Sequence, residues 1–558
     1  MSLLNLVIRA VGAETLFRFN GHCGSPQKSQ EALIRNIVKL NRNSEIGQKY
    51  DFGSIRSLDD FRKKVPIHSY ADLSPYIEAA LNGKPAQLTD QTPILFATTS
   101  GTTGKSKFIP VTPESKKIKS RLTRTWIAGI HRDHPDIFSG KILSVVSPEV
   151  EEYAPCGTPC GAESGQGYRD MPKALKKSYS QPYEVYTIND YDSKYYTLLR
   201  IAAGQQISFM VACNPSTVLL MAQRLGENGE SIIRDVRDGT LSTDITITDE
   251  IRSVVEAQLK PDPERARFLE KAAAENGGVL IPRHVWPELK LIGCWKGGSV
   301  SLYLERFDQY FRKHLPVRDM GWLASEVRGS IPLSDEGDDG PLAIDTNVYE
   351  FYPADREGSP GNDDLLTVDQ LEEGKRYYVY VTTFAGLYRY DMNDILEVTG
   401  FYKNTPMIRF VQKGKGVISF TGEKLYEEQV NTAVREAMAD NNYQGKYEFI
   451  TALGEMKGDK PRYVFLIEFD ELIEQDEAHK LIGAIEQAVR TQNMEYDSKR
   501  KSHRIDTPAM RVIRPGEFAD FRRRQVSGGK MDGQFKRMRL TKDVAFANEF
   551  EAVFEVEL

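Results

Sequence analysis

Apolar residues recur along this chain with two different spacings, and each spacing predicts one kind of element. Within residues 29–40, and again around residues 58–61, they return every three or four positions, which places them on one face of a helix. Residues 92–97 and 108–111 are instead short, nearly continuous apolar runs, which are typical of buried strands. The chain therefore opens with helices and continues into a sheet.

Strands and helices continue to alternate through the middle of the chain. Apolar runs at residues 142–147 and 207–212 predict buried strands, and residues 215–225 predict a helix. Residues 227–278 are highly charged and mostly helical in pattern. Strands that alternate with helices indicate the layered sheet of an α/β domain.

Two more strands are predicted before the pattern changes. The first, at residues 289–293, opens into a glycine pair at 297–298, and a helix with Leu304, Phe307 and Phe311 on one face is expected next. The second covers residues 377–383 and precedes a turn at Ala385-Gly386.

The last part of the chain predicts a separate domain. Residues 412–416, Gln-Lys-Gly-Lys-Gly, are a short basic link rich in glycine. Beyond it we expect helices at 426–438 and 481–489, and strands at 446–453, 463–469 and 510–513. A chain of 558 residues exceeds the size at which one core stops growing. The fold class expected is an α/β large N-terminal domain of layered sheets and helices over residues 1–413, with a smaller mobile α+β C-terminal domain over residues 414–558.

The net charge and the composition of the chain argue against several classes of binding partner. The net charge of −6 gives no general attraction to nucleic acid or to an anionic membrane. Basic runs at residues 499–501 and 522–524 have no interleaved aromatic residues, so solvated surface is favoured over nucleic-acid binding. The apolar run at residues 3–8 is too short to span a bilayer and lacks the layout of a signal peptide.

The five cysteines fit a reducing compartment better than a disulfide framework. Cys156 and Cys160 have His131 and His134 nearby in sequence, but no spacing here matches a closed zinc site. We expect a cytoplasmic enzyme whose partners are small molecules.

The stretch with the most candidate ligand-binding residues lies between two predicted strands, at residues 98–107. It reads Thr-Thr-Ser-Gly-Thr-Thr-Gly-Lys-Ser-Lys. Glycines let backbone N–H groups approach a polyphosphate, hydroxyls donate hydrogen bonds, and lysines neutralise charge. A Walker A loop would need a glycine in place of Thr99 and a helix directly after the lysine. Pro110 lies where that helix would continue. The spacing therefore counts against a P-loop NTPase, and a helix starts only later, at Thr112-Pro113-Glu114.

The remaining pattern, Ser-Gly-Thr-Thr-Gly-x-x-Lys, resembles the phosphate loop of the adenylate-forming, firefly luciferase-like enzymes. Residues 98–110 more narrowly resemble the Gretchen Hagen family of auxin-responsive acyl acid amido synthetases. The resemblance implies that this stretch holds the phosphates of ATP through Thr99, Ser100, Gly101, Thr102, Thr103, Gly104 and Lys105. The alternative from the residues alone is a polar Ser/Thr/Gly turn.

A second segment, Trp322-Leu323-Ala324-Ser325-Glu326, resembles the family's aromatic-Gly/Ala-Ser-Ser-Glu motif. The resemblance implies that Trp322 lies against adenine, that Ser325 belongs to the nucleotide site, and that Glu326 holds magnesium. A carboxylate beside a triphosphate makes sense only with a divalent cation between them, because two bare anions repel. The alternative is a buried tryptophan and a surface glutamate.

A third segment, residues 388–394, resembles the family motif Tyr-Arg-x-x-x-Gly-Asp. The resemblance implies that Asp394 accepts hydrogen bonds from the ribose hydroxyls, which suits the two oxygens of a carboxylate. Asn393 stands where the family has glycine, and asparagine also enters left-handed conformations.

Near the end, residues 527–536 resemble the family's Gly-Gln-Tyr-Lys segment. The resemblance implies that Lys536 is the catalytic lysine of adenylation and that the small domain closes over the active site. A lysine could stabilise the charge that develops between the acid and the α-phosphate. Lys424 is the other candidate for this role.

Together the motifs imply an ATP-dependent ligase that uses Mg²⁺. A carboxylic acid is adenylated to acyl-AMP with release of pyrophosphate, and an amine, usually an amino acid in the plant members, then attacks to form the amide. Arg121 and Arg124, on the helix after Thr112, are candidates to meet the acid. An acyl-CoA ligase with a thiol acceptor and a nucleotide-binding regulatory protein remain as alternatives.

Overall fold

The computed structural model describes residues 3–99, 107–356, 358–414, 417–418, 425–458, 460–501, 505–527, 540–541 and 543–558. It divides into two compact units, Met1–Gly297 with Asp308–Phe410, and Gly298–Phe307 with Val411–Leu558. The division expected at residue 413 lies close to this boundary. Residues 298–307, which we expected in the large domain, group with the second unit instead.

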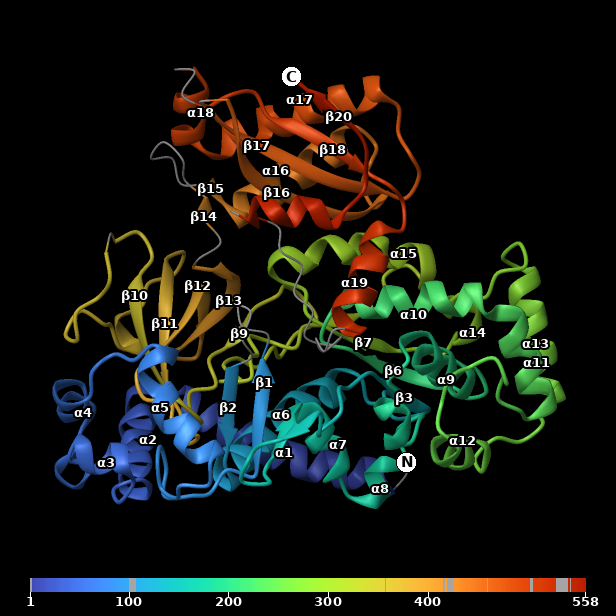
Figure 1. The fold of residues 1–558 in the computed structure, drawn as a ribbon. Coiled ribbons are helices and arrows are strands. Elements are labelled where there is room, and N and C mark those ends of the chain that lie inside the picture. Colours follow the sequence, from blue (N-terminus) through green and yellow to red (C-terminus); the bar gives the residue numbers. More distant parts are fainter. Residues whose placement is uncertain are drawn as a thin grey trace. The chain divides into compact units, whose positions relative to one another are not determined.

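Helices form the first part of the chain, as the spacing predicts (Figure 1). Ser57 and Ser69 begin two of them with reciprocal capping boxes, which satisfy N–H groups that the helix itself leaves unpaired. These helices are α1 (Leu3–Cys23), α2 (Pro26–Leu40), α3 (Glu45–Lys49), α4 (Leu58–Lys64) and α5 (Tyr70–Leu81).

The glycine-rich stretch joins two antiparallel neighbours, β1 (Leu95–Thr99) and β2 (Lys107–Val111). Thr112 then accepts the Ser115 N–H and begins α6 (Pro113–Asp133), so the predicted helix start is confirmed. The sheet order is β2-β1-β5-β4, with β4 at Glu152–Tyr153 and β5 at Pro159–Gly161.

A parallel sheet in the order β3-β6-β7-β8 forms the α/β part of the first unit. Its strands are β3 (Lys141–Ser144), β6 (Ile207–Val211), β7 (Leu291–Gly293) and β8 (Val317–Arg318). Helices lie around it (Figure 1), and those between β3 and β7 are α7 (Glu163–Arg169), α8 (Lys173–Lys176), α9 (Tyr191–Ala203), α10 (Pro215–Glu227), α11 (Gly229–Asp238), α12 (Asp249–Glu256), α13 (Pro263–Ala274) and α14 (Pro282–Val285).

The helix expected after the glycine pair is present, and most of it is a 3-10 helix. Gly298–Arg306 forms a 3-10 helix, and only one α-helical turn follows, α15 (Phe307–Tyr310). The apolar spacing of this segment fits either helix type, because three and 3.6 residues per turn differ little over so short a length.

A third sheet in the first unit has the order β10-β11-β12-β13-β9. Side chains alternate between buried and less buried along part of β12, whereas most side chains of β10 and β11 are buried. Its members are β9 (Gly340–Pro341), β10 (Val348–Pro353), β11 (Arg376–Thr382), β12 (Tyr390–Tyr402) and β13 (Thr405–Lys413).

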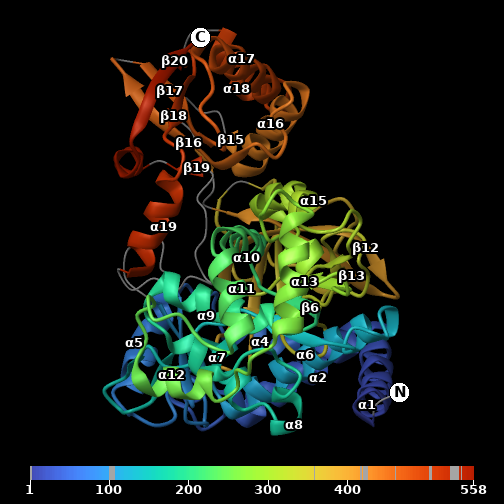
Figure 2. The ribbon, with the colours of Figure 1, turned by 90° about the vertical axis from the view of Figure 1, so that its right-hand side faces the viewer.

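The second unit contains the elements expected for the small domain. Its main sheet has the order β19-β16-β17-β18-β20. One face packs on α16 and α17, and the other on Phe518, Phe521 and Phe550, and Figure 2 shows α16, α17 and α18 together on one side of the strands. The elements are β14 (Val417–Ile418), β15 (Leu425–Tyr426), α16 (Glu427–Asp440), β16 (Tyr447–Lys457), β17 (Lys460–Phe469), α17 (Gln475–Gln492), α18 (Met494–Lys501), β18 (Ala509–Ile513), α19 (Glu517–Ser527), β19 (Leu540–Thr541) and β20 (Ala552–Glu557).

Helices of the length and apolarity needed to cross a bilayer do not occur in the described part of the chain. Within the same residues, no three His, Cys, Asp or Glu side chains come together as a metal site would require. All five cysteines are free thiols.

Candidate active site

Trp322 and Asp394 come from different segments of the first unit and meet in its core. The indole Nε1 of Trp322 donates a hydrogen bond to Asp394 Oδ2 over 2.9 Å. The two residues are 5% and 2% exposed, and a hydrogen bond to a carboxylate is strong in such surroundings. Two residues predicted from separate motifs thus share one site, in which the indole orients the carboxylate.

The ring of Trp322 is fixed by close packing. It lies against the backbone of Gly329, where a Cβ would come within 2.0 Å of Trp322 Cε3. Its centroid is 6.3 Å from that of Tyr349, and its backbone N–H donates to Ser330 Oγ over 2.8 Å. Trp322 is therefore a rigid support for Asp394, and little of its own surface is open to a base.

Asp394 occupies an irregular part of β12 and not a turn between elements. Tyr380 of β11 lies opposite Asp391, and Tyr378 lies opposite Ile395, so the residues between Asp391 and Ile395 bulge out of the ladder. Asn393 in this bulge has φ of 50°, the left-handed conformation expected of it. The bulge frees the Asp394 carboxylate to turn towards Trp322.

Ser325 and Glu326 form the tip of a tight turn. Ala324 and Val327 exchange backbone hydrogen bonds of 2.7 and 3.2 Å across it. Lys119 of α6 donates to the Ser325 carbonyl over 2.7 Å and pairs with Glu163 of α7 over 2.5 Å. These contacts hold the turn in place and leave Glu326 half-buried at its end.

Tyr70 of α5 contacts the strand that follows the glycine-rich stretch. Its hydroxyl accepts the Phe108 N–H over 2.9 Å, and Lys107 Nζ lies 5.1 Å from its ring centroid. Burial raises the pKa of Tyr70, and the nearby Glu326 carboxylate raises it further. The pKa of Tyr390 is raised by the same two causes, burial first. The charge of Glu326 therefore acts on both tyrosine hydroxyls.

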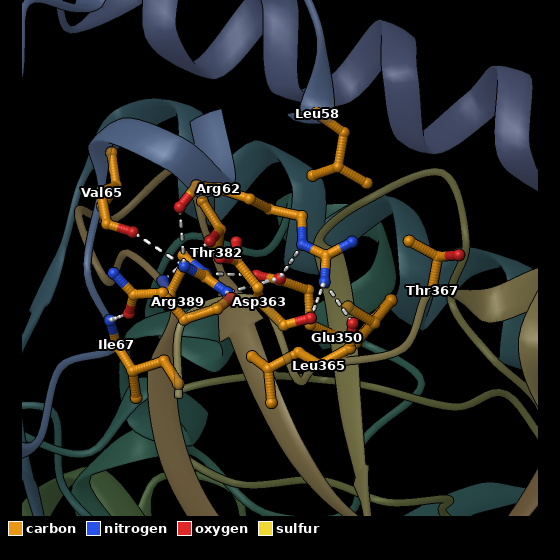
Figure 3. A network of polar contacts seen from close by, with 12 residues as sticks. Leu58, Arg62, Val65, Ile67, Glu350, Asp363, Leu365, Thr367, Thr382 and Arg389 are labelled. Carbon is orange, nitrogen blue, oxygen red and sulfur yellow. Dashed lines mark hydrogen bonds and ion pairs between the residues drawn. The ribbon is translucent and has the colours of Figure 1, made fainter. Parts of the chain in front are cut away.

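The arginine of the third motif has a structural role. Arg389 is fully buried and makes a bidentate ion pair with Glu350 over 2.9 and 3.0 Å. It also donates to the carbonyls of Arg62, Val65 and Asn362. Figure 3 shows this guanidinium at the centre of a polar network that ties α4 to β10 and to the turn before β12.

Part of the predicted site cannot be placed. Thr99 ends β1, but Ser100, Gly101, Thr102, Thr103, Gly104 and Lys105 lie outside the described residues, as do Lys536 and its alternative Lys424. The described part of the candidate site is therefore Thr99, at the end of β1, together with Trp322, Ser325, Glu326 and Asp394.

Several polar residues of this region were not predicted from the sequence, and one of the two arginines predicted to meet the acid already forms an ion pair. Arg121 pairs with Asp345 over 3.1 Å, and Arg124 is exposed. Lys119 and Tyr70 do not belong to any of the sequence motifs. The available signal was helical spacing, since Lys119 follows Ser115 by four residues on the buried side of α6.

Comparison with known proteins gives a consistent result along the chain. The family model described as the GH3 family N-terminal domain matches residues 15–317, the central-domain model matches 340–413, and the C-terminal-domain model matches 428–545.

Relatives match over nearly the full length. The chain is 25% identical over 557 residues to jasmonoyl--L-amino acid synthetase GH3.5 of Oryza sativa subsp. japonica, with 94% of each chain covered. It is 27% identical over 560 residues to indole-3-acetic acid-amido synthetase GH3.10 of Arabidopsis thaliana, with 92% of each covered.

A solved structure, that of the GH3.15 acyl acid amido synthetase, superposes with a TM-score of 0.85 at 21% identity, with 97% of each chain covered. This likeness confirms the expected fold class. The domain matches show that the chain belongs to the GH3 family, the Gretchen Hagen family that its motifs resemble.

Proposed function

We propose that this protein is an ATP-dependent acyl acid amido synthetase, a ligase that adenylates a carboxylic acid and then transfers the acyl group to an amine of the amino acid class. The observation that carries the proposal is the 2.9 Å hydrogen bond between Trp322 and Asp394, which joins the second and third motifs in one buried site. The GH3 relatives support it, since one is named a jasmonoyl--L-amino acid synthetase and another an indole-3-acetic acid-amido synthetase.

The proposed roles follow from the chemistry of each side chain. Asp394, oriented by Trp322, accepts hydrogen bonds from the ribose hydroxyls. Residues 99–105 bind the β- and γ-phosphates through N–H groups, hydroxyls and the Lys105 ammonium. A carboxylate is a poor electrophile, and adenylation gives it a good leaving group. The protein then chiefly holds acid, ATP and amine in reacting positions.

Glu326 is the proposed ligand for Mg²⁺. Its carboxylate makes no hydrogen bond or ion pair with any side chain in the described ranges, and it sits half-buried at a turn held by Lys119. Magnesium commonly takes one or two carboxylates together with substrate phosphates. A single carboxylate beside a triphosphate site fits this coordination preference, and the ion would neutralise phosphate charge there.

The test is acid-dependent exchange of radioactive pyrophosphate into ATP, followed by product masses with amino acids and with CoA as acceptors. We expect exchange with at least one carboxylic acid, and an amide from an amino acid. Thioester formation without amide would identify an acyl-CoA ligase instead. Absence of exchange with every acid in a broad panel would overturn adenylation and favour a regulatory nucleotide-binding protein.

A further inference from the structure

Arg328 is a buried cation two residues beyond Glu326. It is 6% exposed and pairs with Leu323 in an antiparallel bridge across the turn that carries Ser325 and Glu326. Its guanidinium carbon lies 5.7 Å from the ring centroid of Trp126, and Nη1 donates to Thr123 Oγ1 over 2.8 Å. Both partners belong to α6, so this helix fixes one edge of the guanidinium.

The other edge of the guanidinium, formed by Nε and Nη2, makes no hydrogen bond within the described ranges. Neither Nε nor Nη2 of Arg328 meets a hydrogen-bond acceptor there. An arginine guanidinium stays positively charged at neutral pH. Burying such a charge without a counter-ion is costly.

Other buried arginines of the same unit differ from Arg328 in this respect. Arg389 forms a bidentate pair with Glu350, and Arg318 pairs with Asp133 and Asp335 over 2.7 and 2.6 Å. No carboxylate of the described chain lies within ion-pair distance of Arg328. Arg389 and Arg318 therefore each have a carboxylate partner, although Arg318 Nη1 makes no hydrogen bond, whereas Arg328 has no such partner and its buried Nε and Nη2 meet no acceptor among the described residues.

The position of Arg328 is where ligands of parallel α/β sheets bind, at the carboxyl ends of the strands. Cys213, two residues past the end of β6, is close enough that the Arg328 charge partly offsets the rise of its pKa by burial. Trp126 lies against Gly293, the last residue of β7, where a Cβ would come within 2.9 Å of the indole.

We propose that Arg328 binds a carboxylate of the acid substrate through Nε and Nη2. Two parallel N–H donors on one edge of a guanidinium match the two oxygens of a carboxylate, which lysine cannot reproduce. This inference rests on the proposed function and adds a specificity-determining residue to it. The carboxylate is either the one that is adenylated or a second one on a dicarboxylic acid, and the test separates these sources.

The experiment compares wild type with Arg328→Met, Arg328→Lys and the surface control Arg35→Met in pyrophosphate exchange. The acids are matched pairs with one or two carboxylates, hexanoate with adipate and phenylacetate with 1,4-phenylenediacetate. Arg328→Met is expected to raise the KM for the acid by at least about tenfold, as loss of a charged hydrogen-bond pair predicts. The KM for ATP is expected to change less than about twofold. Arg328→Lys is expected to fall between wild type and Arg328→Met, and Arg35→Met to match wild type.

The two sources of the carboxylate give different patterns. Equal losses for both members of a pair identify the carboxylate that is adenylated, and a loss confined to the diacid identifies a second one. An unchanged KM for every acid, or equal increases for acid and ATP, would overturn the inference.

Measurements of thermal stability and of acid binding distinguish a substrate-binding role of Arg328 from a purely structural one. Removing an unpaired buried charge is expected to raise the melting temperature of the ligand-free protein, whereas loss of a structural contact would lower it and count against the inference. Calorimetric titration of the same four acids without ATP is expected to show binding to wild type and at least about tenfold weaker binding to Arg328→Met. Acid binding without any exchange would defeat only the proposed function, and no acid binding to wild type would defeat the inference.

Discussion

Replacing Trp322 by phenylalanine keeps an aromatic ring and removes one hydrogen-bond donor from Asp394. We expect the free energy of unfolding to fall by about 1–3 kcal/mol, because a buried carboxylate oxygen loses its partner. The KM for ATP is expected to rise about tenfold with a smaller change in kcat, since the carboxylate loses its orientation. Pyrophosphate exchange and thermal denaturation measure the two effects.

The matched control is Trp286→Phe. Trp286 is also buried and donates its Nε1 to the Ala202 carbonyl over 3.1 Å, away from the candidate site. It is expected to lose stability without a change in the KM for ATP. Equal KM values for wild type and Trp322→Phe would remove Trp322 and Asp394 from the nucleotide site.

Gly329 is needed because the Trp322 ring occupies the space of a side chain. A methyl group there would lie 2.0 Å from Trp322 Cε3, so Gly329→Ala must displace the ring and with it the hydrogen bond to Asp394. Overpacking of this kind costs about 1–3 kcal/mol, and we expect weaker ATP binding in exchange assays. Gly167→Ala, with no atom within 4 Å of the new methyl group, is expected to leave both stability and ATP binding intact. Similar behaviour of the two variants would show that the ring can move without consequence.

At the scale of elements, the ion pairs of Glu350 join α4 to β10 and to the turn before β12. Glu350 is 1% exposed and is paired with Arg389 and Arg62. Glu350→Gln leaves a buried guanidinium without its counter-ion, so we expect the free energy of unfolding to fall by about 3–5 kcal/mol in urea denaturation. Glu14→Gln breaks the exposed pair with Arg18 on α1 and is expected to cost less than about 1 kcal/mol. Comparable losses would mean that the network contributes no more than a surface pair.

The contact between β17 and the start of α19 predicts a pH dependence. Glu468 of β17 is buried and accepts the N–H groups of Gly516 and Phe518 over 2.9 and 2.7 Å. Burial raises its pKa from 4.5 to about 7, and the N–H groups offset part of the rise. The folded state therefore binds this proton more tightly than the unfolded state. Its contribution to stability is full below pH 4.5 and is lost as the pH rises through about 7.

The measurement is the melting temperature of wild type and Glu468→Gln between pH 4.5 and 8. Burial also raises the pKa of Asp319 in the first unit to about 7, so wild type alone would mix two contributions of the same sign. The difference between the two proteins isolates Glu468. We expect wild type to lose stability relative to the variant as the pH rises, and parallel profiles would contradict the assignment.

At the scale of the whole molecule, we propose that Lys536, near the C-terminal end of the sequence, is the lysine of adenylation. Lys536→Ala is expected to slow the adenylation half-reaction by about a hundredfold or more and to affect aminolysis of a supplied acyl adenylate much less. Single-turnover formation of acyl-AMP and of the amide measures the two steps. Lys424→Ala is the comparison, and a selective loss of adenylation in that variant would exchange the two roles. Equal losses in both steps would rule out Lys536 as the adenylation lysine.

Much of the fold was predictable because its signals are local. The start of α6 at Thr112, the strands on either side of the glycine-rich stretch, and the elements of the second unit follow from spacing, capping and turn residues. The placement of Gly298–Phe307 was not predictable, since the segment groups with residues far along the chain. Arg306 pairs there with Glu448 and Asp470.

The sequence by itself determined which residue types are available for the reaction and in which order, and so the family and the class of chemistry. The tertiary structure alone decided what those residues touch. It turned the Trp322 indole to Asp394 through a bulge in β12, paired Arg389 with Glu350, and left Nε and Nη2 of Arg328 buried without an acceptor among the described residues. The physical reason is that helix and strand periods depend on neighbours in sequence, whereas the partner of a buried charge depends on strand register and packing between distant segments.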